Sequence, residues 1–460
     1  MRRRALVTGL RALGFAVLSA TAVGPVLGHG GSLGGAARES LTVPAWLMLA
    51  TGGAAVGASF LLSSFATDRS AIDALVARRR PLRLPAGTAL RRVAGALGVV
   101  VLFGILVTGY VGPTDPLSNP AVVVVWGGWW AGFAMSTYLV GNTWPAVNPW
   151  RTVVSALPDL GRRYRWQWGA WPSVVGLLAL LWIEVVSPLA DEPTVLATTV
   201  LGYSVVTLAG AVVYGPETWF SEVDPVARVF RYYGAVAPFG RAADGSLELR
   251  LPGVAVASDL LDGVDEVAFV VALLWVTTFD GFVATPAWRA LARWLVGLGY
   301  PPALLYPGAM LVGFALFLGL YLLAARLARR TAPTYIATET LARRFAPPLL
   351  AIAAGYHVAH FLGYFLSLTP ALVTAVTAPL ATVNPPLVVV PGWFGGVAIA
   401  GILGGHLVAI LAAHATAFEL FAGRLQAIRS QYPFIAVMIC YTMASLWIVT
   451  RPDVPLPYLP

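Results

Sequence analysis

Residues 355–366 read GYHVAHFLGYFL, so that His357 and His360 stand among aliphatic, aromatic and glycine neighbours. The rest of the chain has the same character, because hydrophobic residues make up 58% of its 460 residues and charged residues only 11%. A soluble domain contains about 25% charged residues. Apolar runs also reach, again and again, the roughly 20 residues that a helix needs to cross a bilayer. These features predict an all-α fold, a polytopic transmembrane helical bundle.

Residues 1–28 are typical of a secretion signal, because the basic start MRRR precedes an apolar run that ends in the short side chains of Val26-Leu27-Gly28. An uncleaved first helix is the alternative. Residues 29–460 are then expected to form a single integral membrane domain. Its apolar runs predict ten spans, at about residues 42–66, 90–112, 120–141, 170–190, 194–214, 264–284, 302–325, 346–369, 393–416 and 433–449.

Arginine marks one side of the membrane. The chain has 30 arginines and no lysine, and 22 of the arginines fall in alternate loops, at 67–92, 142–169, 216–263, 326–345 and 417–432. Since basic loops stay in the cytoplasm, we expect a cell-membrane protein whose mature N-terminus lies outside. The net charge of +9 is then explained by the orientation of the chain in the membrane and by contact with anionic lipid. We therefore expect no nucleic-acid partner. No nucleotide-binding fingerprint is present, and the single Cys440 excludes an intrachain disulfide.

Two of these loops contain related segments. TWPAVNPWRTVVSAL begins at Thr143 and TWFSEVDPVARVFRYY begins at Thr218, and one inserted residue aligns them. Asn148 and Asp224 suit the N-cap of a helix, because a proline follows each and proline has no N–H to lose in the first turn. We expect two short amphipathic helices on the cytoplasmic membrane surface, with Arg228 on the polar side of the second. An old duplication and chance similarity both remain open.

Ionisable side chains within the hydrocarbon layer are candidates for function, because they are costly to insert. His357, His360, His406 and His414 lie on two consecutive, antiparallel spans. Counting about 1.5 Å per residue places His360 and His406 at a similar level near the midplane. We therefore expect this pair to bind a cofactor or metal, with copper as the first choice and haem as the alternative. His357, one turn from His360, and His414 are further candidate metal ligands. Proton relay, and structural hydrogen bonds to a neighbouring carbonyl or to Tyr356 or Tyr364, are the other interpretations.

Three further residues are candidates outside that pair. Cleavage after Gly28 would leave His29 as the mature N-terminus, where its amine and ring could chelate copper. Glu184, within LLALLWIEVVSP, is expected either to hydrogen-bond between helices or to act as a proton carrier or as a ligand. Asp280, within TTFDGF, is expected either to cap a break before Gly281 or to face an outward cavity.

Several segments together resemble one family of polytopic membrane proteins of actinobacteria and haloarchaea often labelled fenitrothion hydrolase. The resemblance implies histidines at His29, His360, His406 and His414, and none at the position of His357. It fails at Ala415, where the family usually has an aspartate, and in the glycine spacing after His29. The label implies hydrolysis of organophosphate triesters by a metal-activated water. The similar segments are His29-Gly30, NPWR (148–151), TTFDGF (277–282), AHFLGYF (359–365), GHLVAILAAH (405–414) and RSQYPFIAVMICYTMASLWI (429–448).

Three functions remain open from the sequence. The first is a metal or haem protein with a redox or metal-handling role, in which His360 and His406 are the core ligands. The second is a metal-assisted hydrolase of lipophilic esters, as the resemblance implies. The third is a gradient-driven transporter of a small molecule or metal ion, with Glu184, Asp280 and the histidines along the path.

Overall fold

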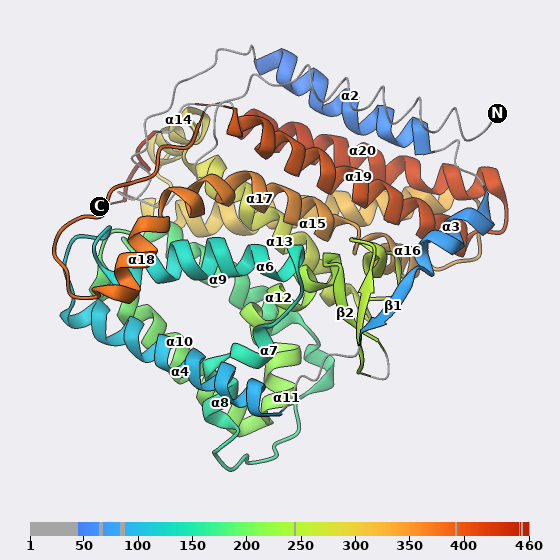
Figure 1. Cartoon of the computed structure of the whole chain (residues 1–460). Helices are drawn as coiled ribbons and strands as arrows, with labels where there is room; N and C mark the ends of the chain where they lie inside the picture. The colour runs from blue at the N-terminus through green and yellow to red at the C-terminus, as the bar shows by residue number, and fades with distance from the viewer. Residues whose placement is uncertain are drawn as a thin grey trace.

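The computed structural model describes residues 45–63, 68–82, 88–242, 245–391, 393–449, 451 and 454–459. The expected signal segment and His29 lie outside the described residues. The described chain is mostly helical, and its long helices run side by side in one bundle (Figure 1). Its elements are α2 (Ala45–Ser63), α3 (Arg69–Val76), β1 (Arg79–Leu82), α4 (Thr88–Val111), α5 (Pro120–Val123), η2 (Val124–Phe133), α6 (Ala134–Leu139), α7 (Trp144–Val147), α8 (Pro149–Val154), η3 (Trp166–Trp168), α9 (Trp171–Val186), α10 (Pro193–Tyr214), α11 (Pro216–Thr218), η4 (Trp219–Val223), α12 (Pro225–Val236), β2 (Phe239–Arg241), β3 (Leu247–Arg250), η5 (Val254–Ala257), α13 (Val264–Val283), α14 (Pro286–Gly297), η6 (Pro302–Leu304), α15 (Leu305–Thr331), α16 (Thr338–Phe345), α17 (Leu349–Ser367), α18 (Thr369–Thr377), α19 (Phe394–Leu420) and α20 (Arg424–Val449).

Membrane-spanning helices dominate the structure, which confirms the expected helical membrane bundle. Among the described residues, eight helical segments are long and apolar enough to cross a bilayer. Two of the ten expected spans correspond to shorter apolar helices, at Gly52–Leu61 and Trp171–Val186. The expected loop 417–432 is mostly helical, because α19 continues to Leu420 and α20 already begins at Arg424.

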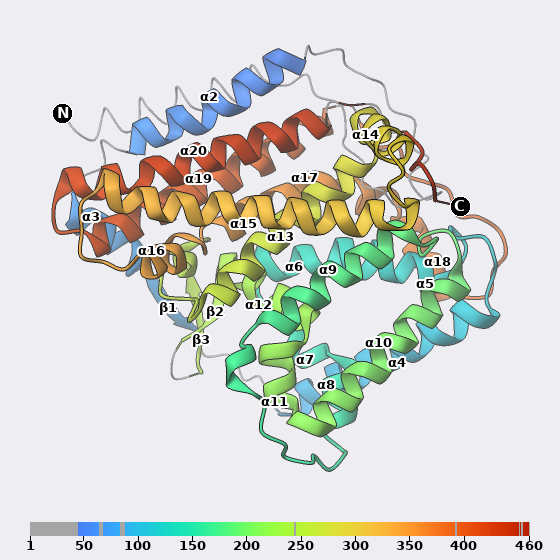
Figure 2. The same cartoon turned by 180° about the vertical axis from the view of Figure 1, so that it is seen from behind.

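Helix α13 occupies the centre of the bundle. From Val267 to Leu273 every side chain is at most 1% exposed, which is typical of a helix that is apolar on all sides. By contrast, α4 lies at the edge and turns large apolar side chains outward, such as Phe103 at 68% exposed. Helices α4 and α10 are inclined to the other long helices (Figure 2).

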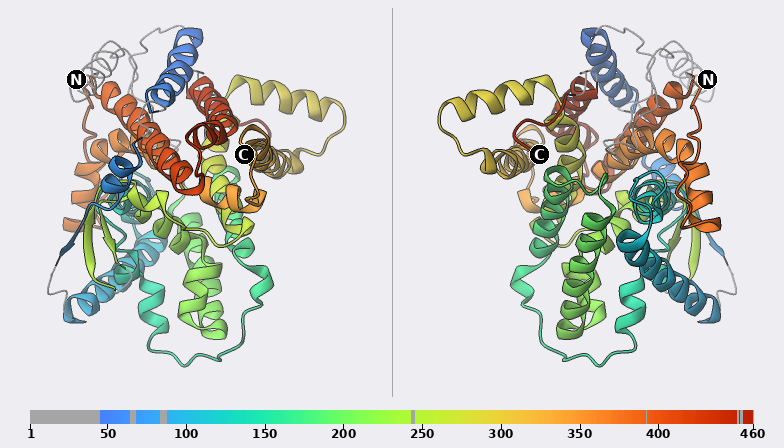
Figure 3. Two further views of the ribbon diagram at one scale, coloured as in Figure 1. Left: turned by 90° about the vertical axis from the view of Figure 1, so that its right-hand side faces the viewer. Right: turned by 90° about the vertical axis from the view of Figure 1, so that its left-hand side faces the viewer.

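The two ends of the bundle differ. α3, α16 and the strands lie at one end, and α14, α18 and the C-terminal end of the chain lie at the other (Figure 1). Three of the arginine-rich loops, 67–92, 216–263 and 326–345, supply α3, the strands and α16 and meet at this end. At the opposite end α14 projects sideways from the bundle (Figure 3).

The three short strands are a feature that the sequence interpretation missed. They pair antiparallel in the order β1-β3-β2. Glu248 on β3 lies 3.3 Å from the guanidinium of Arg79 and 3.6 Å from that of Arg250. The sequence does not predict this small sheet, because β1 pairs with a hairpin that is remote in sequence and no local pattern encodes such pairing.

The two related loop segments adopt related structures. Asn148 accepts a hydrogen bond from the Arg151 N–H and caps α8, and Asp224 accepts one from the Ala227 N–H and caps α12. The caps share extended backbone angles, with φ −61° and ψ 112° at Asn148 and φ −69° and ψ 114° at Asp224. Both expected N-caps are confirmed.

The inserted residue is absorbed as a single wide turn before the second cap. The Asn148 N–H donates to the Trp144 carbonyl at 2.8 Å, four residues back, whereas the Asp224 N–H donates to the Trp219 carbonyl at 2.9 Å, five residues back. A π turn is the usual way for a helix to accommodate one extra residue. The structure thus pairs the tryptophans, the caps and the prolines of the two segments.

The expected surface position of the second helix is wrong. α12 is buried along most of its length, and Arg228, which the sequence places on a polar face, is 0% exposed. α12 packs against α6, α9 and α17 inside the molecule. The first helix, α8, also turns Trp150 and Val154 into the interior. An amphipathic pattern shows that one side of a helix is polar, but it does not show what that side contacts. Here the polar side of α12 contacts the carboxylates of Glu222 and Glu266 instead of water.

Candidate functional site

Three polar aromatic side chains follow one another along α17 at intervals of four residues, namely Tyr356, His360 and Tyr364. This spacing places them on the same side of the helix. The rings of Tyr356 and His360 stack with centroids 5.8 Å apart and planes 15° apart. His360 is 9% exposed and Tyr364 is 2% exposed. α17 therefore presents a buried polar stripe to its neighbours.

Two carboxylates on other helices interact electrostatically with the tyrosines of this stripe. Glu184 on α9 interacts electrostatically with Asp280 on α13, although the two are remote in sequence. Asp280 also interacts with Tyr356, and Glu184 with Tyr364. The hydroxyl of Tyr364 has no hydrogen-bond partner among the described residues. We call Glu184, Asp280, Tyr356, His360 and Tyr364 the acid cluster.

The acid cluster lies off-centre in the bundle. α9, α13 and α17 all run from the arginine-rich end toward the end that carries α14 and α18 (Figure 2). Glu184 and Asp280 stand in the last turns of their helices. The two acids are thus nearest the end of the bundle that is poor in arginine.

A cavity of about 470 Å³ adjoins the cluster between α4, η2, α9 and α10. Its lining on α4 extends from Ala94 to Ile105, which corresponds to a length of about 16 Å. Among the described residues that line it, Glu184 is the single acidic or basic side chain. Volumes of about 300–1,000 Å³ are usual for small-molecule sites. The cavity is therefore a lipophilic compartment with one carboxylate in its wall.

The π-helical segment η2 explains the aromatic wall of the cavity. Its sequence, VVWGGWWAGF, alternates tryptophans and glycines. Trp126, Trp129 and Trp130 line the cavity, while Gly127 and Gly132 allow Leu368 and Phe365 to pack closely on the other side. π-Helical turns are uncommon and frequently occur at functional sites.

The two related segments close the cavity at its arginine-rich end, where Pro149 and Pro225 line it. Tyr203, also in the lining, donates a hydrogen bond of 2.7 Å to the Asp224 carboxylate. Burial raises the pKa of Asp224 to about 6, although hydrogen bonds from the Ala227 N–H and from Tyr203 act in the opposite direction. A second carboxyl group, that of Asp224, therefore lies behind Tyr203 and outside the lining of the cavity.

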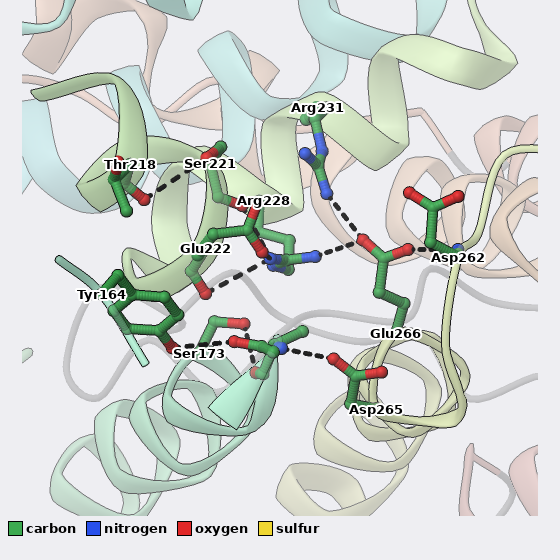
Figure 4. Close-up of polar contacts among 12 residues, drawn as sticks. Tyr164, Ser173, Thr218, Ser221, Glu222, Arg228, Arg231, Asp262, Asp265 and Glu266 are labelled. Atoms are coloured by element: carbon green, nitrogen blue, oxygen red, sulfur yellow. Dashed lines mark hydrogen bonds and ion pairs between the residues drawn. The ribbon is translucent and has the colours of Figure 1, made fainter. Parts of the chain in front are cut away.

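Arg228 organises a buried ion-pair network at the arginine-rich end (Figure 4). Its guanidinium lies 2.7 Å from a Glu266 oxygen and 3.1 Å from a Glu222 oxygen. The same Glu266 oxygen accepts hydrogen bonds from Arg231 at 3.1 Å and from the Tyr232 hydroxyl at 2.8 Å. Burial disfavours the charged guanidinium, but Tyr232 and the two glutamates outweigh burial and raise the pKa of Arg228. This network joins α12 to the start of α13.

The neighbouring Asp265 joins α13 to α9. Its carboxylate accepts a hydrogen bond from the N–H of Ala170, the N-cap residue of α9 (Figure 4). A carboxylate at a helix N-terminus is also favoured by the helix dipole. The starts of α9 and α13 are thus held together, and the same two helices carry Glu184 and Asp280 near their other ends.

The remaining intramembrane histidines have separate surroundings. His357 lies 3.0 Å from the Tyr138 hydroxyl through Nδ1 and packs against the ring of Trp130. Both ring nitrogens of His406 have close partners, the Ile402 carbonyl at 2.8 Å and the Thr442 hydroxyl at 2.7 Å. His414 Nδ1 lies 3.3 Å from the Gln431 amide nitrogen.

The structure does not bring His360 and His406 to one level. Helices α17 and α19 cross so closely that a Cβ at Gly355 would lie 2.5 Å from the Gly401 carbonyl oxygen and 3.0 Å from the Gly405 Cα. This register offsets His360 from His406 by about eight residues, or about 12 Å along the helix axes. The expected shared level fails although α17 and α19 begin within three residues of the expected spans, because the glycine contacts between them set a register that shifts one helix past the other.

No group of three or more His, Cys, Asp or Glu side chains that could hold a metal ion occurs among the described residues. His360 belongs to the acid cluster and His406 bonds to α20, so the expected ligand set is divided between different parts of the bundle. Sequence reasoning named Glu184, Asp280 and His360 as site candidates, and Tyr356 and Tyr364 only as hydrogen-bond partners of the histidines. The four-residue spacing of these tyrosines around His360 was the available signal.

No protein-family model, no curated protein and no solved structure matches this chain, and its function is therefore inferred from its own geometry.

Proposed function

We propose that this protein is a proton-coupled membrane carrier in which Glu184 and Asp280 take up and release the coupling proton. The proposal is carried by the position of these two acids, in the last turns of the packed helices α9 and α13, where their charges interact inside an apolar bundle. Two like charges repel each other much more strongly in a low-dielectric interior than in water. Such a pair holds a shared proton and titrates as a unit.

The other members of the acid cluster suit the same role. Tyr364 and Tyr356 flank the two acids with hydroxyl groups that can donate hydrogen bonds to whichever carboxylate is ionised. His360, stacked on Tyr356, adds a side chain that can accept a proton near neutral pH. Buried acids and histidines of this kind mark proton paths in membrane pumps and transporters.

The arginine distribution supports an orientation for the carrier. We infer that the end with α3, α16 and the strands faces the cytoplasm of the cell membrane, because it collects the arginine-rich loops. The acid cluster then lies toward the outside. With α2 and the short helix α9 counted as spans, the mature chain crosses the membrane ten times and begins outside.

Transient currents after a pH jump on a solid-supported membrane would test the proton role. The reconstituted wild-type protein should displace charge when its acids bind or release protons, and Glu184→Gln and Asp280→Asn should each lose most of that current. Asp191 and Glu192 provide a matched control, because they are exposed acids between α9 and α10. Asp191→Asn and Glu192→Gln should keep the current. Full currents in Glu184→Gln and Asp280→Asn would overturn the proposal.

A second candidate is hydrolysis of a lipophilic ester, as the family resemblance implies. The position of Glu184 in the wall of an apolar cavity favours it, because a carboxylate there can act as a general base toward water. Release of nitrophenolate from a lipophilic nitrophenyl ester, lost in Glu184→Gln and accompanied by no pH-jump current, would favour the hydrolase over the carrier.

A further inference from the structure

The cavity beside the acid cluster has an unusual combination of walls. Five tryptophans line it, namely Trp126, Trp129, Trp130, Trp144 and Trp150, and most of the other lining residues are aliphatic. Against this apolar surface stands the carboxylate of Glu184. Trp126 packs in the same apolar cluster as Leu189 and Ile183, and Ile183 directly precedes Glu184 in sequence. One end of the cavity therefore combines an acid with an aromatic face.

This combination selects for ligand charge. Aromatic faces attract cations through their negative π surface, with tryptophan the strongest. A carboxylate in a low-dielectric site attracts a cation far more strongly than it would in water and repels an anion equally. A neutral lipid tail would fill the volume but would leave the carboxylate without a counter-charge, which is costly in an apolar environment.

We propose that the cavity binds a lipophilic organic cation, with the apolar groups of the ligand among the tryptophans and its positive centre beside Glu184. Binding of this ligand follows from the cavity itself. The further statement that the cation is the transported solute, exchanged for the proton on the Glu184–Asp280 pair, rests on the proposed carrier function. A single carboxylate that binds either the proton or the cation would couple the two, because each ligand excludes the other.

Two ions of nearly the same shape and opposite charge test the proposal. Tetraphenylphosphonium and tetraphenylborate would each be titrated into the purified full-length chain in detergent, with binding followed by calorimetry. Wild type should bind the phosphonium at least about tenfold more tightly than the borate. Equal affinity for the two ions, or binding of neither, would overturn the proposal.

Variants at one position locate the cation. Glu184→Gln should weaken phosphonium binding by about tenfold or more and leave borate binding unchanged or improved, whereas Glu184→Asp should retain the preference for the cation. Glu192→Gln is the matched control on an exposed acid and should bind as wild type does. If Glu184→Gln does not fold, as judged by its thermal unfolding transition, the comparison of Glu184→Asp with wild type decides. Unchanged phosphonium affinity in a folded Glu184→Gln would overturn the proposal.

The binding assay and the carrier assay can fail separately. Phosphonium binding in detergent needs no gradient, so a failure there overturns the cation site and leaves the pH-jump currents to judge the carrier. Conversely, tight binding together with absent currents would retain the cation site and overturn proton coupling.

Discussion

The guanidinium of Arg228 lies 2.7 Å from the carboxylate of Glu266, and the arginine side chain is completely shielded from solvent. Breaking such a buried pair by removing one partner leaves an uncompensated charge, which costs about 3–5 kcal/mol. Arg228→Met should therefore lower the thermal unfolding temperature in detergent markedly. The double variant Arg228→Met, Glu266→Met should be less destabilised than the sum of the single variants.

An exposed ion pair of similar geometry provides the control for this prediction. Arg151 lies 2.7 Å from Glu217, whose side chain is 83% exposed. Solvent screens this pair, so Arg151→Met should change stability by no more than about 1 kcal/mol. Equal losses of stability in Arg228→Met and Arg151→Met would show that burial does not strengthen the contribution of the Arg228 network.

The N-cap Asp224 predicts a pH dependence of stability. Its pKa is raised by burial from 3.8 to about 6, so the folded state binds this proton more tightly than the unfolded state. The resulting stabilisation is fully present below pH 3.8 and is lost as the pH rises through about 6. Wild type should therefore lose about 3 kcal/mol relative to Asp224→Asn across this interval, measured as unfolding temperature against pH.

The matched position in the other segment tests the same reasoning in reverse. Asn148 is 2% exposed and caps α8 as Asp224 caps α12. Asn148→Asp should be less stable than wild type at pH 7 and should recover as the pH falls. A pH-independent effect of Asn148→Asp would contradict the view that burial controls both caps.

The close crossing of α17 and α19 depends on glycine. A Cβ at Gly355 would lie 2.5 Å from a backbone oxygen of α19, so Gly355→Val must force the helices apart. Small residues at helix crossings in membranes permit such close approach. Gly404 offers the comparison, because a Cβ added there would have no atom within 4 Å. Gly404→Ala should be neutral or stabilising by up to about 1 kcal/mol, while Gly355→Val should lower the unfolding temperature.

The separation of His360 and His406 gives a prediction about metal. Both ring nitrogens of His406 have hydrogen-bond partners, the Ile402 carbonyl and the Thr442 hydroxyl. His406 should therefore stabilise the fold and not bind a metal. His406→Ala should lower the unfolding temperature and leave the copper content of the purified protein, measured by mass spectrometry, as in wild type. A stoichiometric copper ion that disappears in both His360→Ala and His406→Ala would restore the shared ligand pair.

Much of the architecture was predictable from local sequence. The apolar run 264–284 matches α13, at Val264–Val283, and the run 194–214 matches α10, at Pro193–Tyr214. The caps at Asn148 and Asp224 were also predictable, because a cap depends on its own side chain and the proline that follows. The burial of Arg228 was not, since its partner Glu266 belongs to another helix.

The site was predictable only as separate residues. Glu184, Asp280 and His360 stand out because each is polar within an apolar span, but nothing in their spacing shows that α9, α13 and α17 are neighbours. The depth argument for His360 and His406 failed for the same reason, since it counted residues from expected span ends while the glycine contacts of α17 with α19 set the actual register.

By itself, the sequence determined that this chain is a helical membrane protein and where most of its long helices run. Those properties follow from bilayer thickness and from the free-energy cost of moving charge across the bilayer. They can be read from the sequence of each span separately. Only the tertiary structure decided which helices touch, how each is rotated and where the carboxylates meet. In a lipid environment every apolar helix face is equally soluble, so hydropathy cannot specify which helices become neighbours. Close packing at glycines and buried polar contacts determine the neighbours instead.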